Sequence, residues 1–158
     1  VFDNGNFVHD RFKKYLKEMG VLESVEVEVK DEELEVVGRY DARVKIKDEL
    51  YIIDFKSINS DYVNEPMKHH VLQITYYMFL SGIKNGILLY EGKGNQNLYE
   101  FEIKYDEELI KEARSWFKKL KQYINYNRVP EIDPSYERNK YPCSWGKNKC
   151  GYWKYCYG

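Results

Sequence analysis

The sequence has few cysteines and prolines and lacks the long runs that mark several large protein classes. Among its 158 residues are 3 cysteines and 4 prolines, and no apolar run approaches the roughly 20 residues that span a bilayer. It shows no apolar region of a secretory signal and no low-complexity stretch. These absences exclude membrane-spanning, collagen-like and wholly disordered classes. They predict a cytoplasmic protein of a prokaryote or of a viral host cell, with no membrane partner.

No excess of one charge is present either. The chain has 25 Lys and Arg against 26 Asp and Glu, for a net charge of −1, which excludes a uniformly basic nucleic-acid coat. Residues 138–158 differ from the rest, because they carry five basic side chains, six Tyr or Trp residues and no acid. Such a segment suits a polyanion whose bases can stack. A small satellite core with a solvated rim is the alternative.

Hydrophobic periodicity predicts a mixed α/β fold. The expected order is helix, three or four strands, helix, two strands, helix and an irregular tail after residue 130. Gly38 is expected to interrupt the second strand at a bulge or bend. The expected helices and strands cover residues 7–19, 25–29, 34–37, 41–46, 50–55, 65–80, 86–90, 98–103 and 106–126. We expect residues 1–130 to form the core and residues 131–158 to form a cysteine-containing extension of it.

Three charged side chains are expected to meet at one end of a hairpin. Asp54 and Lys56 lie two apart on an otherwise apolar strand, so they project from the same face. A turn at residues 47–49 brings Asp41 opposite residues 54–56. Oxygen ligands of this kind suit Mg²⁺ or Mn²⁺, and the lysine can hold a phosphate or orient a water molecule. A structural ion pair at a sheet edge is the alternative.

Two flanking helices contribute further candidates. Gln73 and Tyr77 are four residues apart, so they share one helix face, and His69 continues the same line. His9 lies on the first helix beside its apolar stripe, and its nitrogen suits Mn²⁺. A polar helix flank and a surface or core histidine are the alternatives.

In this order, the motifs Gly5-x-x-x-His9, Gly38-x-x-Asp41, Asp54-x-Lys56 and Gln73-x-x-x-Tyr77 resemble those of the PD-(D/E)xK nuclease superfamily. More narrowly, they resemble the RecB-like branch that includes the iron–sulfur CRISPR-associated exonucleases. Tyr40 stands where the superfamily name has proline. The resemblance implies a restriction-endonuclease-like core, in which a small mixed β-sheet is flanked by helices.

The resemblance also implies roles for individual residues. His9, Asp41, Asp54 and the Phe55 carbonyl would bind the divalent metal. Lys56 would be the catalytic lysine, and Gln73 and Tyr77 would position Lys56 and the DNA backbone. The implied reaction is hydrolysis of phosphodiester bonds by metal-activated water.

The three cysteines, Cys143, Cys150 and Cys156, all lie within the last 16 residues. Their odd number argues against a disulfide framework, and clustered thiolates favour zinc or an iron–sulfur cluster. The resembled nucleases hold a 4Fe-4S cluster with three such cysteines and one that precedes the Gly-x-x-x-His motif. The spacing from Cys150 to Cys156 matches theirs. The spacing from Cys143 is longer, since Lys147 occupies the expected position. Packing of reduced cysteines among aromatic residues is the other alternative.

These observations predict a metal-dependent deoxyribonuclease, specifically an exonuclease acting on single-stranded DNA or DNA ends. A non-catalytic nucleic-acid-binding module and a site-specific endonuclease on the same fold are the alternatives. A homo-oligomer and a larger DNA-processing complex are both compatible with the sequence.

Overall fold

The chain forms two compact units that divide within one long helix. The computed structural model describes residues 2–60, 62–132 and 135–158, with side chains from residue 7 onward. The first unit extends through Phe117 and the second begins at Lys118, whereas the sequence pattern suggested a change at residue 130. Within the described ranges, no helix is long and apolar enough to cross a membrane.

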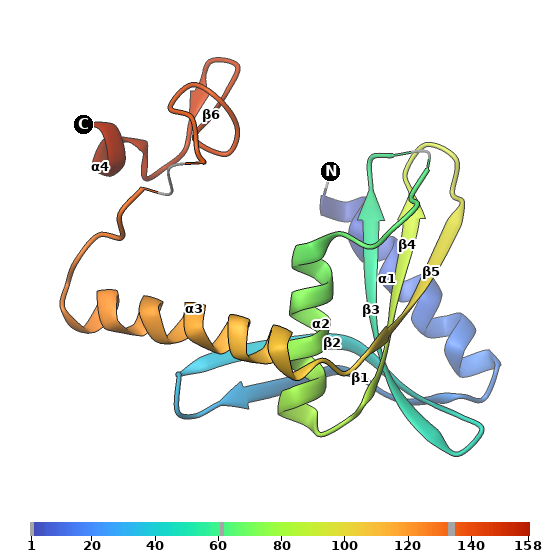
Figure 1. Ribbon diagram of the computed structural model, residues 1–158. Helices are drawn as coiled ribbons and strands as arrows, with labels where there is room; N and C mark the ends of the chain where they lie inside the picture. The colour runs from blue at the N-terminus through green and yellow to red at the C-terminus, as the bar shows by residue number, and fades with distance from the viewer. Residues whose placement is uncertain (1, 61, 133–134) are drawn as a thin grey trace. The chain divides into compact units, whose positions relative to one another are not determined.

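A five-stranded mixed sheet forms the centre of the first unit (Figure 1). Its strands lie in chain order, and β3 pairs with β4 in parallel while the other neighbours are antiparallel. The strands are β1 (Leu22–Asp31), β2 (Val36–Ile46), β3 (Glu49–Ile58), β4 (Asn85–Gly92) and β5 (Leu98–Lys104). The parallel pair needs a crossover, which α2 (Lys68–Ser81) provides. The predicted α/β class is therefore confirmed.

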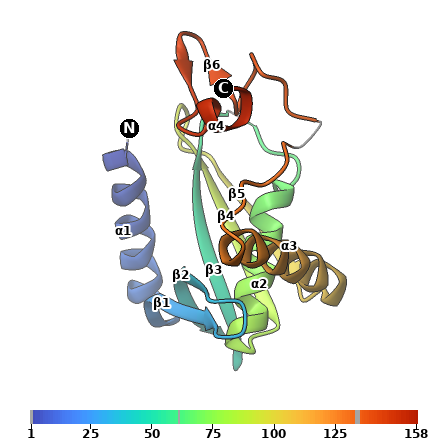
Figure 2. The same ribbon diagram turned by 90° about the vertical axis from the view of Figure 1, so that its left-hand side faces the viewer.

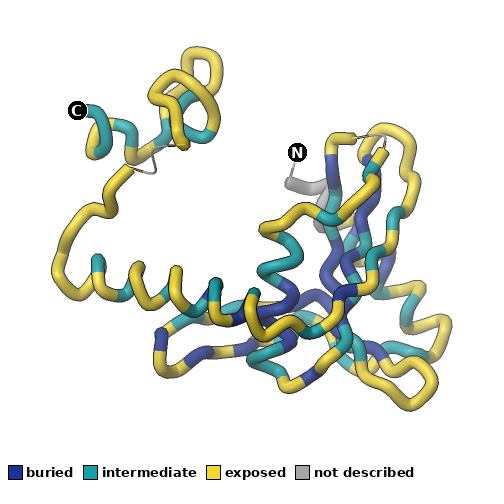
Figure 3. The backbone as a smooth tube through the Cα atoms, in the orientation of Figure 1, coloured by how far each residue is buried: buried dark blue, intermediate teal, exposed yellow. Residues whose placement is uncertain are grey.

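Helices cover both faces of the sheet, as Figure 2 shows for α1 (Phe2–Glu18) and α2. Val8 and Phe12 of α1 pack on one face, against a cluster that includes Phe55. Ile74 and Met78 of α2 are fully buried on the other face. Because β3 is covered from both sides, its residues 50–55 are apolar except for Asp54, and Figure 3 shows buried residues concentrated on the central strands.

The third helix, α3 (Glu107–Asn125), begins at a side-chain cap. Asp106 Oδ1 accepts hydrogen bonds from the amides of Glu108, at 2.8 Å, and Leu109, at 3.1 Å. Ala113 lies buried on the first half of the helix. Trp116 lies on the apolar stripe of this helix and is nevertheless 58% exposed.

The predicted division of β2 at Gly38 is wrong. Residues 32–35 form a turn, and β2 then continues through Gly38, which pairs with Val29. A Cβ atom on Gly38 would lie 2.5 Å from Cε1 of Tyr77. The glycine is needed for the close approach of this helix side chain, and it makes no break in the strand.

The second helix starts later than its sequence pattern indicates. The predicted start was residue 65, but Met67 has an extended backbone (φ −65°, ψ 131°) and α2 begins at Lys68. Met67 was expected in the buried stripe and is instead 41% exposed. Pro66 disfavours helical geometry in the residue before it, which is consistent with a helix that begins beyond the proline.

The second unit has short elements where the sequence indicated an irregular tail. They are β6 (Ser144–Trp145), β7 (Asn148–Lys149) and α4 (Trp153–Tyr157). β6 and β7 pair as a tight hairpin, and Gly146 at its turn has a positive φ of 59°. Glycine adopts this conformation without steric cost.

A buried carboxylate ties three elements of the first unit together. Asp31 of β1 accepts a hydrogen bond from the hydroxyl of Tyr76 at 2.5 Å and one from the Leu34 amide at 3.1 Å, and it forms an ion pair with Arg114. Burial raises the pKa of Asp31, but the hydrogen bond from Tyr76 and the other donors hold the pKa below its ordinary value. The charged form of Asp31 therefore stabilises the packing of β1 against α2 and α3.

We expect Asp31→Asn to lower the free energy of unfolding by about 3 kcal/mol at neutral pH, because it leaves Arg114 without its buried partner. The folded-state pKa lies below the unfolded one, so this stabilisation is present above the unfolded value, near ~3.9. It is lost as the pH falls through the folded-state pKa. Urea unfolding at several pH values checks this. The difference in free energy of unfolding between wild-type protein and Asp31→Asn should become smaller in acid. The control Asp48→Asn, at an exposed position, should change the free energy of unfolding little.

Candidate active site

The site forms where two neighbouring strands separate. The ladder between β2 and β3 runs from Ile46 opposite Glu49 to Ala42 opposite Ile53 and then ends. Past this point the Phe55 amide donates a hydrogen bond to Oδ2 of Asp41 at 2.7 Å, in place of a strand partner. The predicted hairpin is confirmed, and it brings Asp41 alongside residues 54–56.

His9 reaches Asp41 from helix α1. Its Nδ1 lies 3.2 Å from Asp41 Oδ1, and its ring contacts Phe55 edge-on with centroids 5.6 Å apart. The hydrogen bond to Asp41 raises the pKa of His9, although burial opposes this shift. Burial raises the pKa of Asp41, but the hydrogen bonds from His9 and the Phe55 amide hold it below its ordinary value. With Nδ1 oriented by a carboxylate, Nε2 is the nitrogen available to a metal ion.

Asp54 is a carboxylate that the fold has almost completely buried. It is 3% exposed, and its Oδ2 forms an ion pair with Lys56 Nζ at 2.6 Å. Burial raises the pKa of Asp54 to about 6 against the opposing attraction of Lys56, and Asp41 contributes to the increase. A carboxylate oxygen of this kind, close to a second carboxylate, suits a bound cation.

A chain of hydrogen bonds holds Lys56 from helix α2. Lys56 Nζ donates to Oε1 of Gln73 at 2.8 Å, and Nε2 of Gln73 donates to the hydroxyl of Tyr77 at 2.9 Å. Burial raises the pKa of Tyr77, so this hydroxyl stays protonated at neutral pH. The structure thus connects Asp54, Lys56, Gln73 and Tyr77 in one continuous network.

Glu26 is a site residue that the sequence pattern did not identify. Its carboxylate, the His9 ring and Asp41 offer ligand atoms that all lie within 4.8 Å of one another. Glu26 has a positive φ of 50°, which is uncommon for a residue other than glycine, and it forms ion pairs with Lys13 and, at 2.9 Å, with Arg39. The strict alternation in residues 25–29 predicts only a half-buried strand. Only the pairing of β1 with β2 places it beside Asp41.

These donors fit a small divalent cation. His9, Glu26, Asp41 and Asp54 supply carboxylate oxygens and one imidazole, which suit Mg²⁺ or Mn²⁺. Asp54 is buried beside them, and its carboxylate, already in an ion pair with Lys56, would gain further from a bound cation. Among the described residues, one group of three His, Cys, Asp or Glu side chains has all its ligand atoms within 4.8 Å of one another. This group is His9, Glu26 and Asp41.

The three cysteines belong to the second unit. All are free and partly buried, and the Cys150 amide donates to the Cys143 carbonyl at 2.9 Å. Cys143 Sγ lies 3.4 Å from the hydroxyl of Tyr157. The hydrogen bond with Cys143 raises the pKa of Tyr157 to about 12. The inorganic centre expected at these thiols stays a prediction.

Basic side chains lie on aromatic rings in the same unit. The Arg138 guanidinium is 4.6 Å from the Trp153 ring centroid and 5.5 Å from that of Tyr157. Lys149 Nζ lies 3.5 Å from the Trp153 ring. The tail therefore combines cations with aromatic faces, as its composition predicted, and such contacts also stabilise a small folded unit.

Both the sequence and the structure of this chain are similar to those of known nucleases. The sequence profile of the PD-(D/E)XK nuclease superfamily matches residues 5–157. The structure is similar to that of SSO0001, with a TM-score of 0.54 and 25% identity, over 73% of this chain and 59% of that one. It is also similar to an alkaline exonuclease from Laribacter hongkongensis, with a TM-score of 0.53 and 14% identity, over 72% of this chain and 66% of that one. No curated protein matches in a sequence comparison.

We expect Glu26→Gln to weaken Mn²⁺ binding roughly tenfold or more, because it removes a charge beside His9 and Asp41. Titration calorimetry with Mn²⁺ measures this effect directly. Glu28→Gln is the matched control, since Glu28 lies on the same strand in an exposed ion pair with Lys30. Unchanged affinity for Mn²⁺ in Glu26→Gln would mean that Glu26 serves only its ion pairs with Lys13 and Arg39.

Proposed function

Because the chain belongs to the PD-(D/E)XK nuclease superfamily, we propose that it is a metal-dependent deoxyribonuclease. We further propose an exonuclease of the RecB-like branch that hydrolyses single-stranded DNA or DNA ends. The chain spans 59% of the length of SSO0001, so the proposal concerns the activity of this segment. The observation that carries it is the meeting of Asp41, Asp54 and Lys56 where β2 leaves β3.

The chain's own residues would bind the cation and orient the reactants. His9, Asp41, Asp54 and the Phe55 carbonyl are the proposed ligands, together with Glu26. When bound there, Mg²⁺ or Mn²⁺ supplies an activated water molecule and stabilises charge on the phosphate. The buried carboxylates keep their negative charges beside the cation.

Lys56 would act on the reacting atoms themselves. Its ammonium has three N–H donors, of which one donates to Gln73 Oε1 while Asp54 attracts the charge. A remaining donor can orient the attacking water or bind a phosphate oxygen. Gln73 is a positioning residue in this scheme, because it holds Lys56, and Tyr77 holds the Gln73 amide in turn.

The second unit would guide the strand. Arg138 and Lys149 offer positive charge beside Trp153, a pairing suited to a phosphate backbone and stacked bases. We also propose that Cys143, Cys150 and Cys156 bind an inorganic centre, with a 4Fe-4S cluster as the first candidate and zinc as the second.

Release of nucleotides from end-labelled single-stranded DNA in Mn²⁺ tests the activity. A covalently closed single-stranded circle is the companion substrate, because it offers no ends. Degradation of the linear strand alone supports the exonuclease. Cutting of the circle would instead support an endonuclease, and binding without cleavage would support a non-catalytic module.

We expect Lys56→Ala to lower the cleavage rate by about a hundredfold or more while Mn²⁺ still binds, because a group that stabilises developing charge is lost. Single-turnover kinetics and Mn²⁺ titration measure the two quantities separately. Lys45→Ala is the control, since Lys45 is exposed and pairs with Asp48 at the surface. A near-normal rate for Lys56→Ala would contradict the catalytic role.

We expect protein purified without oxygen to contain iron or zinc bound by the three cysteines, because metal binding stabilises a tail too short to build a core. Metal analysis and visible absorption identify the centre. Cys150→Ser should lose the metal and lower the thermal stability of the second unit, whereas Ser144→Ala should retain both. If wild-type protein contains neither metal, the proposed centre is wrong, and the three cysteines are reduced residues that pack among the aromatic side chains.

A further inference from the structure

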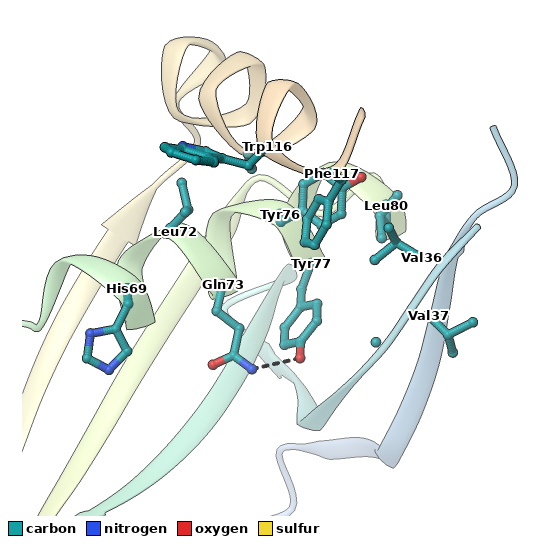
Figure 4. A pocket seen from close by; sticks show the side chains of 12 residues that line it. Val36, Val37, His69, Leu72, Gln73, Tyr76, Tyr77, Leu80, Trp116 and Phe117 are labelled. Carbon is teal, nitrogen blue, oxygen red and sulfur yellow. Dashed lines mark hydrogen bonds between the residues drawn. The ribbon is translucent and has the colours of Figure 1, made fainter. Parts of the chain in front are cut away.

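A groove of about 440 Å³ lies beside the proposed catalytic centre (Figure 4). It is enclosed by the start of β2, the outer side of α2 and the first half of α3, all within the first unit. Its volume is in the range of pockets that bind small organic groups. We call it the Trp116 groove. Its described lining residues are Val36, Val37, Gly38, His69, Leu72, Gln73, Tyr76, Tyr77, Leu80, Ala113, Trp116 and Phe117.

The groove is continuous with the catalytic network. Gln73 and Tyr77 line it, and the same Gln73 accepts the hydrogen bond from Lys56 at 2.8 Å. Figure 4 shows the Gln73 amide and the Tyr77 hydroxyl joined at one end of the groove. A molecule held in the groove would therefore lie one side chain away from the lysine proposed to act on the phosphate.

The walls present flat apolar faces. Trp116 is 58% exposed, and in Figure 4 its indole lies above Leu72, while Phe117 and Tyr76 line the groove farther along. An exposed tryptophan over an apolar depression marks a binding surface more often than it marks a core position. The described lining contains no Lys, Arg, Asp or Glu, so the groove suits a neutral group and does not suit a phosphate.

Apart from His69, the polar groups of the lining are engaged already, and the Tyr76 hydroxyl donates to Asp31. The Gln73 oxygen accepts a hydrogen bond from Lys56, and its nitrogen donates one to Tyr77. Neither group is therefore fully available to form hydrogen bonds with the edge of a bound ring. Aromatic faces with few free hydrogen-bonding groups bind a ring by stacking and discriminate weakly between its edges.

From these observations we propose that the Trp116 groove holds a nucleobase of the substrate strand, close to the scissile phosphate, with Trp116 as its stacking residue. The inference rests on the proposed nuclease function, since it assigns the phosphate to the metal and Lys56 and the adjoining base to the groove. It implies that every base is accepted with similar affinity and that the stacked base fixes the strand's position relative to Lys56.

An abasic scan of the substrate tests the proposal. Single-stranded oligonucleotides, each with one abasic nucleotide, are bound to wild-type protein and to Trp116→Ala in Ca²⁺ at fixed salt. We expect Trp116→Ala to weaken binding of intact DNA roughly tenfold. At one position, the abasic nucleotide should weaken binding to wild-type protein by a similar factor. It should leave binding to Trp116→Ala almost unchanged, because both changes remove the same contact.

Two further variants separate stacking from general effects. Trp116→Phe keeps an aromatic face and should retain most of the affinity and the response to the abasic position. Tyr15→Ala removes an exposed aromatic side chain from α1, and its scan should match that of wild-type protein. A 2-aminopurine at the sensitive position should lose fluorescence on binding to wild-type protein and keep it with Trp116→Ala.

The possible failures are distinguishable. In one outcome, DNA is bound and cleaved while every abasic position weakens binding to wild-type protein and to Trp116→Ala by the same factor. In that case the groove does not hold a base, while the nuclease function stands. If Trp116→Ala abolishes a concentration-dependent dimer in sedimentation and leaves DNA binding unchanged, the groove is a protein interface. If the chain neither binds nor cleaves DNA, the proposed function and this inference both fail.

Discussion

The hydrogen bond from the Phe55 amide to the Asp41 carboxylate is the interaction on which the candidate site depends. It forms at 2.7 Å where the β2–β3 ladder has just ended, so a carboxylate takes the place of a strand carbonyl. This keeps Asp41 beside the part of β3 that has no partner in β2, within reach of His9 from α1 and close to Asp54. Without a partner, the buried amide would cost free energy, and the separation of the two strands would have no local support.

The charges around this point compensate one another only in part. Two carboxylates, Asp41 and Asp54, are buried close together, and Lys56 lies between Asp54 and the Gln73 amide. Burial outweighs the attraction of the lysine at Asp54, which explains the raised pKa of that carboxyl group. Perturbed charges of this kind are common at functional sites, and two buried carboxylates close together suit a bound cation.

The two units are built on different physical principles. The first buries an extensive apolar core on both faces of its sheet, so apolar packing is the main stabilisation of the elements that hold the site. Past the end of α3, the described residues of the second form two short strands and one short helix, and their contacts include cation–aromatic pairs and half-buried cysteines. A segment of this size lacks the apolar area to fold by burial, and this is the reason for proposing a bound inorganic centre as the source of its stability.

Periodicity and spacing by themselves determined the order of the main elements, the αβ class and the proximity of Asp41 to Asp54 and Lys56. These features depend on neighbours along the chain, because alternation and helical repeat assign faces and a short turn sets a hairpin register. Tertiary structure decided the rest. Only the packing of Tyr77 explains Gly38, and only the pairing of β1 with β2 brings Glu26 to His9. The exposure of Trp116 likewise depends on how α3 lies across α2, since a helical stripe shows which residues share a face but not what covers them.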